Sequence, residues 1–197
     1  RGGDMTDKQR VALLSSMTDD VGQLVLSDNY QQTGAVSIEA NKGFEMLNAH
    51  GQLIRKMEAA GALDRTIEFL PDDKNLAERA QMRVGLTSPE LAVLLAYTKI
   101  TLKEAILATT LPDAPELQQL LAEYFPAALV KQCSAEIPNH PLKREIVTTQ
   151  LVNRLVNRMG TCFTMQIGDE TGADVAQIAA AWYGASQLLN AEATWRE

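Results

Sequence analysis

Hydrophobic residues recur along this chain mainly at the three- and four-residue spacing of amphipathic helices. The clearest case is residues 142–159, in which Leu151, Leu155 and Met159 follow one another at four-residue intervals. This spacing places the apolar side chains on one face of a helix, which predicts a helix packed against the rest of the protein. Gly160 comes next and predicts its C-terminal end.

Helix starts are also visible at several places. Thr6–Gln9 and Thr87–Glu90 each carry a Thr three residues before Gln or Glu, the pattern of a capping box. The acidic residues in Thr18–Asp20 and at 72–73 also indicate helix starts, because negative charge is stabilised at the positive, N-terminal end of a helix dipole. Thr171–Asp174 predicts the start of a last helix that runs to about residue 190.

The helix predicted to start at Thr18–Asp20 carries an apolar face. Val21, Leu24, Val25 and Tyr30 fall near one side of it, so this face is expected to pack. Gly34 is expected to kink or end the helix.

The helix that follows the capping box at Thr87–Glu90 is apolar on nearly all sides. Gly85 is expected to end the helix before it, and Leu91, Leu94 and Leu95 predict a helix in the protein interior. Thr101 begins another capping pattern, so a break near Ile100 is expected.

The remaining segments complete an all-helical pattern. Gly61 predicts a helix end, residues 63–70 are expected to form a short helix, and Pro71 closes it. Residues 161–167 have β-type composition but no partner strand nearby. We therefore expect an all-α protein, an irregular multi-helix bundle of roughly eight to ten helices with no substantial sheet. The chain is read as one helical domain, 1–197, with 1–84 and 85–197 as its two subregions.

The amino-acid composition excludes some classes of function. The chain has 197 residues, 46% of them hydrophobic, which is enough for one buried core. Its net charge of −7 argues against a nucleic-acid or anionic-membrane surface, because both require basic side chains to neutralise phosphate. The longest apolar run, Leu91–Tyr97, is too short to span a bilayer, and no signal peptide is recognised. A cytoplasmic protein is expected, and the opening Arg1–Asp4 suggests a piece of a longer polypeptide.

The sequence contains none of the common catalytic motifs. The sequence has no glycine-rich dinucleotide loop after a strand, no phosphate-binding Gly-Lys-Ser/Thr and no Gly-x-Ser-x-Gly. His140 is read as a loop residue and His50 as a helix-surface or packing residue. Cys133 and Cys162 are read as reduced structural cysteines, and no metal site is predicted. The acid pairs at 19–20, 72–73 and 169–170 are each assigned to helix starts rather than to catalysis.

One polar stripe stands out on the helix predicted for 142–159. Asparagine is a poor helix former, so two of them inside a helix suggest a specific contact. Amide and guanidinium groups can hydrogen-bond another helix, a loop or an anion, whereas the plainer alternative is a face turned to solvent. We predict a polar interdomain or helix–helix contact here, formed by Gln150, Asn153, Arg154, Asn157 and Arg158.

A set of motifs gives the chain a resemblance to a known family. Taken together they resemble the C-terminal region of the large bacterial NAD-specific glutamate dehydrogenases, over most of the chain. The motifs are residues 5–10, 25–33, 63–65, 68–73, 87–99, 124–126, 140–146 and 149–158.

This resemblance implies a parent enzyme that oxidises L-glutamate to 2-oxoglutarate and ammonia with NAD. The catalytic residues and the dinucleotide fold of that family lie upstream, so no catalytic, cofactor-binding or metal-binding residue is assigned to this chain. The resemblance implies a structural, oligomerisation or regulatory role, with the parent's catalytic domain as partner and a homo-oligomeric parent. A free-standing helical protein-interaction module and, after it, an independent small helical enzyme remain as alternatives.

Overall fold

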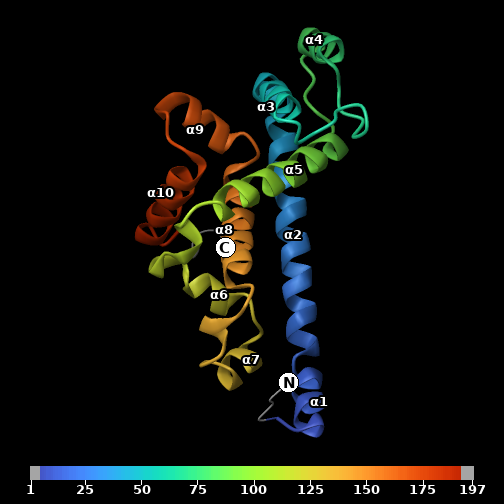
Figure 1. Cartoon of the computed structure of the whole chain (residues 1–197). Coiled ribbons are helices and arrows are strands. Elements are labelled where there is room, and N and C mark those ends of the chain that lie inside the picture. Colours follow the sequence, from blue (N-terminus) through green and yellow to red (C-terminus); the bar gives the residue numbers. More distant parts are fainter. Residues whose placement is uncertain (1–4, 192–197) are drawn as a thin grey trace.

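The computed structural model describes residues 5–191, so Arg1–Asp4 lie outside the described residues. Within these residues the all-α prediction is confirmed, because the chain forms helices and no strand. Figure 1 shows α2 running along one side of the molecule, with α1 at one end and α3 and α5 at the other. The α-helices are α1 (Asp7–Ser16), α2 (Thr18–Lys42), α3 (Leu47–Ala59), α4 (Asp73–Met82), α5 (Ser88–Leu107), α6 (Gln119–Glu123), α7 (Ala127–Gln132), α8 (Lys143–Met159), α9 (Phe163–Thr171) and α10 (Val175–Leu188). Four short 3-10 helices join them: η1 (Gly43–Met46), η2 (Leu111–Asp113), η3 (Pro115–Leu117) and η4 (Ile137–Asn139).

Several predicted helix boundaries are confirmed. Thr6 and Gln9 form the capping box of α1, and Asp174 caps α10 by accepting a hydrogen bond from the backbone N–H of Gln177. Gly160 ends α8 with a φ of 89°, a left-handed value that favours glycine. Local capping chemistry is therefore enough to place these ends.

Helix α2 differs from its prediction in two respects. It continues through Gly34 for 25 residues without a break, since a single glycine lowers helix propensity without forcing an end. Its predicted apolar face is not covered by this chain, because Val21, Leu24 and Val25 are all exposed. Burial begins only in the second half of the helix, at Ala35.

Helix α5 is the central element of the fold. The expected break near Ile100 is wrong, because the hydroxyl of Thr101 donates back to the carbonyls of Tyr97 (3.0 Å) and Thr98 (3.1 Å) within a continuous helix. The helix is buried along one side, through Leu94 and its neighbours, while Ile100 and other residues on its opposite side are exposed. Its apolar surface is thus only partly interior.

Two hydrophobic clusters form the core, and α5 contributes to both. Leu91 and Leu94 pack in one cluster with α3, α4 and the 61–71 loop. Leu95 and Leu102 pack in the other with α6, α8 and α10. Because one rigid helix supplies side chains to both clusters, the two halves of the core cannot move independently of it.

Residues 63–70 form turns rather than the expected short helix. The carboxylate of Asp64 accepts the backbone N–H groups of Thr66 (2.9 Å) and Ile67 (3.1 Å), which closes an Asx turn. The guanidinium of Arg65 is buried beneath this loop and forms an ion pair with Glu58 at 2.8 Å. Local side-chain hydrogen bonds therefore compete successfully with helix formation.

Helix α4 ends close to the expected place, but Gly85 does not end it. The helix ends at Met82, and Arg83 takes the left-handed conformation with a φ of 56°. Gly85 lies in the loop that follows, against the backbone of Gly43, where an added Cβ would approach the Gly43 carbonyl to 2.6 Å. Gly85 is thus required for close approach of two backbones rather than as a helix stop.

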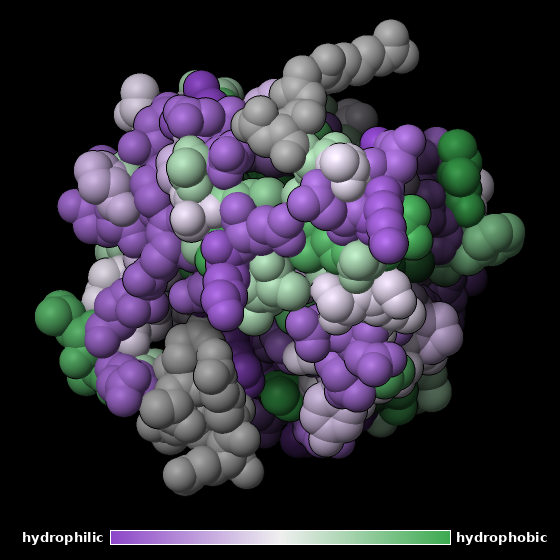
Figure 2. All heavy atoms as spheres, turned by 90° about the horizontal axis from the view of Figure 1, so that it is seen from below, coloured by the Kyte–Doolittle hydropathy of each residue, from purple (hydrophilic) through white to green (hydrophobic). Residues whose placement is uncertain are grey.

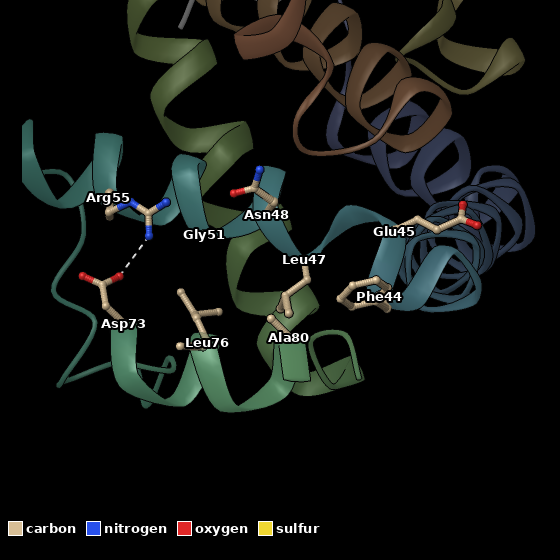
Figure 3. A pocket seen from close by; sticks show the side chains of 10 residues that line it. Phe44, Glu45, Leu47, Asn48, Gly51, Arg55, Asp73, Leu76 and Ala80 are labelled. Carbon is tan, nitrogen blue, oxygen red and sulfur yellow. Dashed lines mark hydrogen bonds and ion pairs between the residues drawn. The ribbon is translucent and has the colours of Figure 1, made fainter. Parts of the chain in front are cut away.

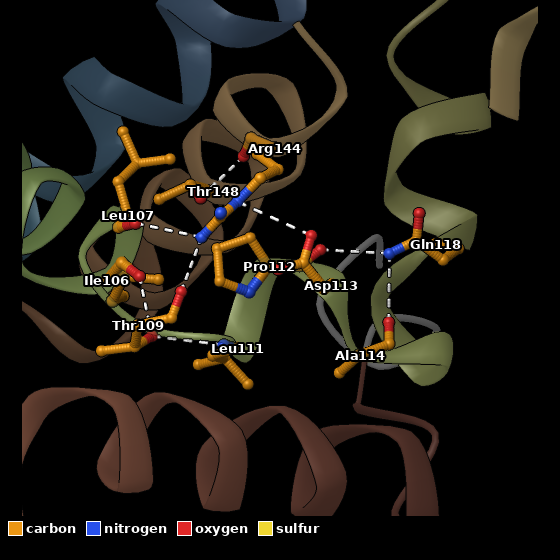
Figure 4. A network of polar contacts seen from close by, with 10 residues as sticks. All are labelled: Ile106, Leu107, Thr109, Leu111, Pro112, Asp113, Ala114, Gln118, Arg144 and Thr148. Carbon is orange, nitrogen blue, oxygen red and sulfur yellow. Dashed lines mark hydrogen bonds and ion pairs between the residues drawn. The ribbon is translucent and has the colours of Figure 1, made fainter. Parts of the chain in front are cut away.

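Arg144 of α8 closes the C-terminal end of α5. Its guanidinium donates to the carbonyls of Leu107 (3.1 Å) and Thr109 (2.6 Å) and faces the carboxylate of Asp113 at 3.6 Å (Figure 4). A positive group at this position satisfies carbonyls that the helix leaves without partners and opposes the negative end of its dipole. This contact fixes where α8 crosses the end of α5.

None of the helices within the described residues combines the length and the hydrophobicity needed to cross a membrane. The division into subregions 1–84 and 85–197 stays a prediction, since α5 belongs to both hydrophobic clusters.

Replacing Leu94 or Leu95 with Ala should lower the free energy of unfolding by about 2–5 kcal/mol, because each substitution leaves a cavity in a packed cluster. Ile100→Ala on the exposed side of the same helix is the control and should cost less than about 1 kcal/mol. Urea denaturation of the three variants makes the comparison. Equal losses at all three positions would contradict the one-sided burial of α5.

Candidate functional site

A polar groove lies between α2 and α8 and contains all five residues of the predicted polar stripe. The groove has a volume of about 560 Å³. Ser27, Asp28 and Gln31 of α2 face the stripe across it, and Glu123 of α6 lies at its edge. The α8 residues in its lining are Gln150, Asn153, Arg154, Asn157 and Arg158.

An arginine in the groove is paired with a carboxylate from a neighbouring helix. Arg154 forms an ion pair with the carboxylate of Glu123, which connects α8 to α6. Asn157 places its Oδ1 atom in a buried position without a hydrogen-bond donor among the described residues. A buried carbonyl oxygen without a donor is costly, so this wall of the groove retains an unused acceptor.

Lys99 of α5 adds a half-buried amine close to Asp28. Burial lowers the pKa of Lys99 to about 8, and the carboxylate of Asp28 opposes this shift. Sequence reasoning missed Lys99, because a single lysine inside an apolar helix does not show which neighbours will desolvate it. The groove thus offers both hydrogen-bond donors and acceptors to a polar partner. The interdomain contact itself stays a prediction.

A second polar group is buried where the end of α2 meets α3 and the α8–α9 junction. The carboxylate of Glu39 lies 2.7 Å from Nε2 of His50 and accepts hydrogen bonds from the Thr161 hydroxyl (2.9 Å) and the Thr161 backbone N–H (3.2 Å). All three residues are almost completely buried. Gly160 leaves room for this arrangement, since an added Cβ would lie 2.0 Å from Oε1 of Glu39.

The charge state of Glu39 follows from its surroundings. Burial raises its pKa, but the hydrogen bond and charge of His50, the hydrogen bond from Thr161 and the charge of Lys42 together hold the pKa below its ordinary value of 4.5. His50 was expected on the helix surface or in packing, and the structure shows it buried and paired with this carboxylate. No sequence signal joined Glu39 to Thr161, which lies 122 positions later.

A cavity of about 410 Å³ lies between α3 and α4 (Figure 3). Its walls include Leu47, Leu76 and Ala80, and the ion pair between Arg55 and Asp73 (2.9 Å) lies at one side. The hydrogen bonds from Arg55 and Arg65 lower the pKa of Asp73, so this carboxylate is held as an anion and is poorly suited to proton transfer. The cavity is a weaker candidate than the polar groove.

The remaining titratable candidates have structural positions. His140 follows η4, and its Nδ1 accepts the backbone N–H of Leu142 at 3.1 Å. Burial raises the pKa of Cys162 to about 12, which keeps its thiol protonated and unreactive. Asp169 lies in the last turn of α9, so its assignment to a helix start is wrong, and it forms an ion pair with Lys56 of α3 at 2.5 Å.

Within residues 5–191 no group of three or more His, Cys, Asp or Glu side chains is arranged to hold a metal ion. Cys133 and Cys162 are both free thiols.

Comparison with known families gives two matches along the chain. Residues 83–197 match the family described as glutamate dehydrogenase, C-terminal. Residues 1–39 match the bacterial NAD-glutamate dehydrogenase catalytic domain. The boundary of the second match falls near the end of α2, at Glu39.

Three curated relatives carry the name NAD-specific glutamate dehydrogenase. The protein of Halomonas elongata is 42% identical over 99% of this chain and 12% of its own length. The protein of Pseudomonas aeruginosa is 46% identical over 92% of this chain and 11% of its own length. That of Mycobacterium tuberculosis is 37% identical over 98% of this chain and 12% of its own length. The chain therefore spans only about one eighth of these relatives.

Glu39→Gln should reduce stability most at neutral pH. A carboxyl whose folded pKa is lowered contributes stability that is present above its unfolded pKa, about 4.5, and is lost as pH falls through the folded pKa. The difference in unfolding free energy between wild type and Glu39→Gln should therefore shrink below pH 4.5. Denaturation at a series of pH values measures it, with exposed Glu104→Gln as control. A difference that is constant with pH would contradict a buried anion at Glu39.

Lys99 should titrate near pH 8 in an NMR experiment on isotope-labelled lysine side chains, well below its ordinary 10.5. Asp28→Asn should lower this pKa further, because it removes the carboxylate that favours the charged amine. Asp19→Asn, in the first turn of the helix α2 that also carries Asp28, should leave the pKa of Lys99 unchanged. Titration of Lys99 above pH 10 would show that it is fully solvated.

Proposed function

This chain belongs to the glutamate dehydrogenase C-terminal family, and we propose that it is the non-catalytic helical segment of an NAD-specific glutamate dehydrogenase. The proposed parent converts L-glutamate and NAD to 2-oxoglutarate, ammonia and NADH. The names of the three relatives support this assignment. The segment's own role is structural: it joins the catalytic domain to the C-terminal part of the enzyme.

The position of α2 is the observation that supports this structural role. The stretch that matches the catalytic domain, 1–39, ends inside α2, and the second half of that helix is built into the same packed body as the stretch that matches the C-terminal family. Ala35 lies in the hydrophobic cluster formed with α5 and α8, and Glu39 is tied to His50 and Thr161. Helix α2 is thus a continuous connection between the two regions.

A helix suits this task because its backbone hydrogen bonds make it stiff. A flexible linker would let the two regions move freely, whereas a helix of 25 residues anchored at one end transmits position and orientation. This structural role is compatible with a homo-oligomeric parent enzyme and with a cytoplasmic location. Both stay predictions.

The isolated 197-residue chain should show no glutamate-dependent reduction of NAD and no saturable heat in a calorimetric titration with NAD. The full-length enzyme that carries this segment should show both, which provides the control. Absorbance at the NADH band measures turnover. Turnover by a clean preparation of the isolated chain would contradict the non-catalytic role, and NAD binding by it would direct attention to the groove formed with Asn153 and Arg158.

A further inference from the structure

The first half of α2 carries exposed apolar side chains on the side that faces away from the polar groove. Leu24 and Asp28 face the polar groove, while Leu26 and Tyr30 each lie two residues further along, about 160° around the helix. Leu26 is 63% exposed and Tyr30 83% exposed, and they are one helical turn apart. Exposed apolar side chains one turn apart, on the side of a helix that its own chain leaves uncovered, can be covered by a further layer of protein.

Helix α1 also carries exposed apolar side chains. Val11 is 64% and Leu14 57% exposed, and they share one face of α1 at three-residue spacing. Figure 1 shows α1 and the start of α2 at the end of the molecule remote from α3 and α4. In the view from that end, hydrophobic residues reach the surface among hydrophilic ones (Figure 2).

Burial differs between the two halves of α2. Ala35 and Glu39 are buried against the packed body of this chain, but residues 18–33 are all exposed. Leu26 and Tyr30 therefore lie in an exposed part of the helix that falls within the stretch matching the catalytic domain. Contiguous exposed apolar side chains of this kind mark an interaction surface.

We propose that Leu26 and Tyr30, with Val11 and Leu14 of α1, dock on the catalytic domain that precedes this segment in the same polypeptide. The occupant follows from the match of residues 1–39 to that domain and from relatives of which this chain spans 11–12%. Helix α2 then lies between the catalytic domain on one side and the α5–α8 body on the other. This inference rests on the proposed function, and it names the surface through which that function operates.

A small surface is sufficient for docking when the two docked regions belong to one polypeptide. Because both sides of the contact belong to one chain, docking is intramolecular and benefits from a high effective concentration. Tyr30 suits the centre of such a contact, since a tyrosine buries a large apolar ring while its hydroxyl keeps a hydrogen-bond partner.

Hydrogen exchange followed by mass spectrometry tests the proposal, on the full-length enzyme and on the isolated chain. Backbone amides of residues 18–33 should exchange roughly tenfold or more slowly in the full-length enzyme, because docking suppresses local opening of the helix. Tyr30→Glu and Leu26→Glu in the full-length enzyme should each remove this protection. In the isolated chain both variants should leave the thermal midpoint unchanged, since these side chains are already exposed.

Met82→Glu is the matched control, since Met82 is an exposed apolar residue at the end of α4, at the other end of the molecule. It should leave the protection of residues 18–33 intact. Equal exchange in the full-length enzyme and the isolated chain would overturn the docking. Concentration-dependent dimerisation of the isolated chain that Tyr30→Glu abolishes would also overturn it, because the occupant would then be a second copy. Glutamate-dependent turnover by the isolated chain would refute the proposed function instead, whatever the exchange rates.

Discussion

The packing of α5 against α8 and α2 is the constraint on which the rest of the structure depends. Leu94 and Leu95, adjacent in sequence, enter different hydrophobic clusters, so the two clusters share one rigid element. Arg144 fixes the end of this helix by donating to the carbonyl of Leu107, its last residue, and to that of Thr109 just beyond it. The position of α8, and with it the polar groove, follows from these contacts.

The buried carboxylate of Glu39 adds a second, more local constraint. It holds the end of α2, the first turn of α3 and the α8–α9 junction at one point through His50 and Thr161. A buried charge is tolerated only when its hydrogen bonds are satisfied, so the backbones around it have little freedom. This is the point at which the segment matching the catalytic domain is anchored in the C-terminal body.

Helix α2 therefore combines two environments in one secondary-structure element. Its second half is part of the packed body, and its first half presents Leu26 and Tyr30 to solvent in this chain. Such a division is expected of an element that belongs to two neighbouring regions of a larger protein. The polar groove beside it is lined by residues from both matched stretches, 1–39 and 83–197, and includes Asp28.

The sequence by itself determined the all-α class, the capped helix starts at Thr6 and Asp174, and the end of α8 at Gly160, because these depend on periodicity and on hydrogen bonds between near neighbours. It also placed the polar stripe of α8 on one face. Only the tertiary structure decided that α5 continues through Ile100, that residues 63–70 form turns, and which groups surround each side chain. The partnership of Glu39 and Thr161 and the desolvation of Lys99 depend on packing between distant segments, and no local pattern encodes them.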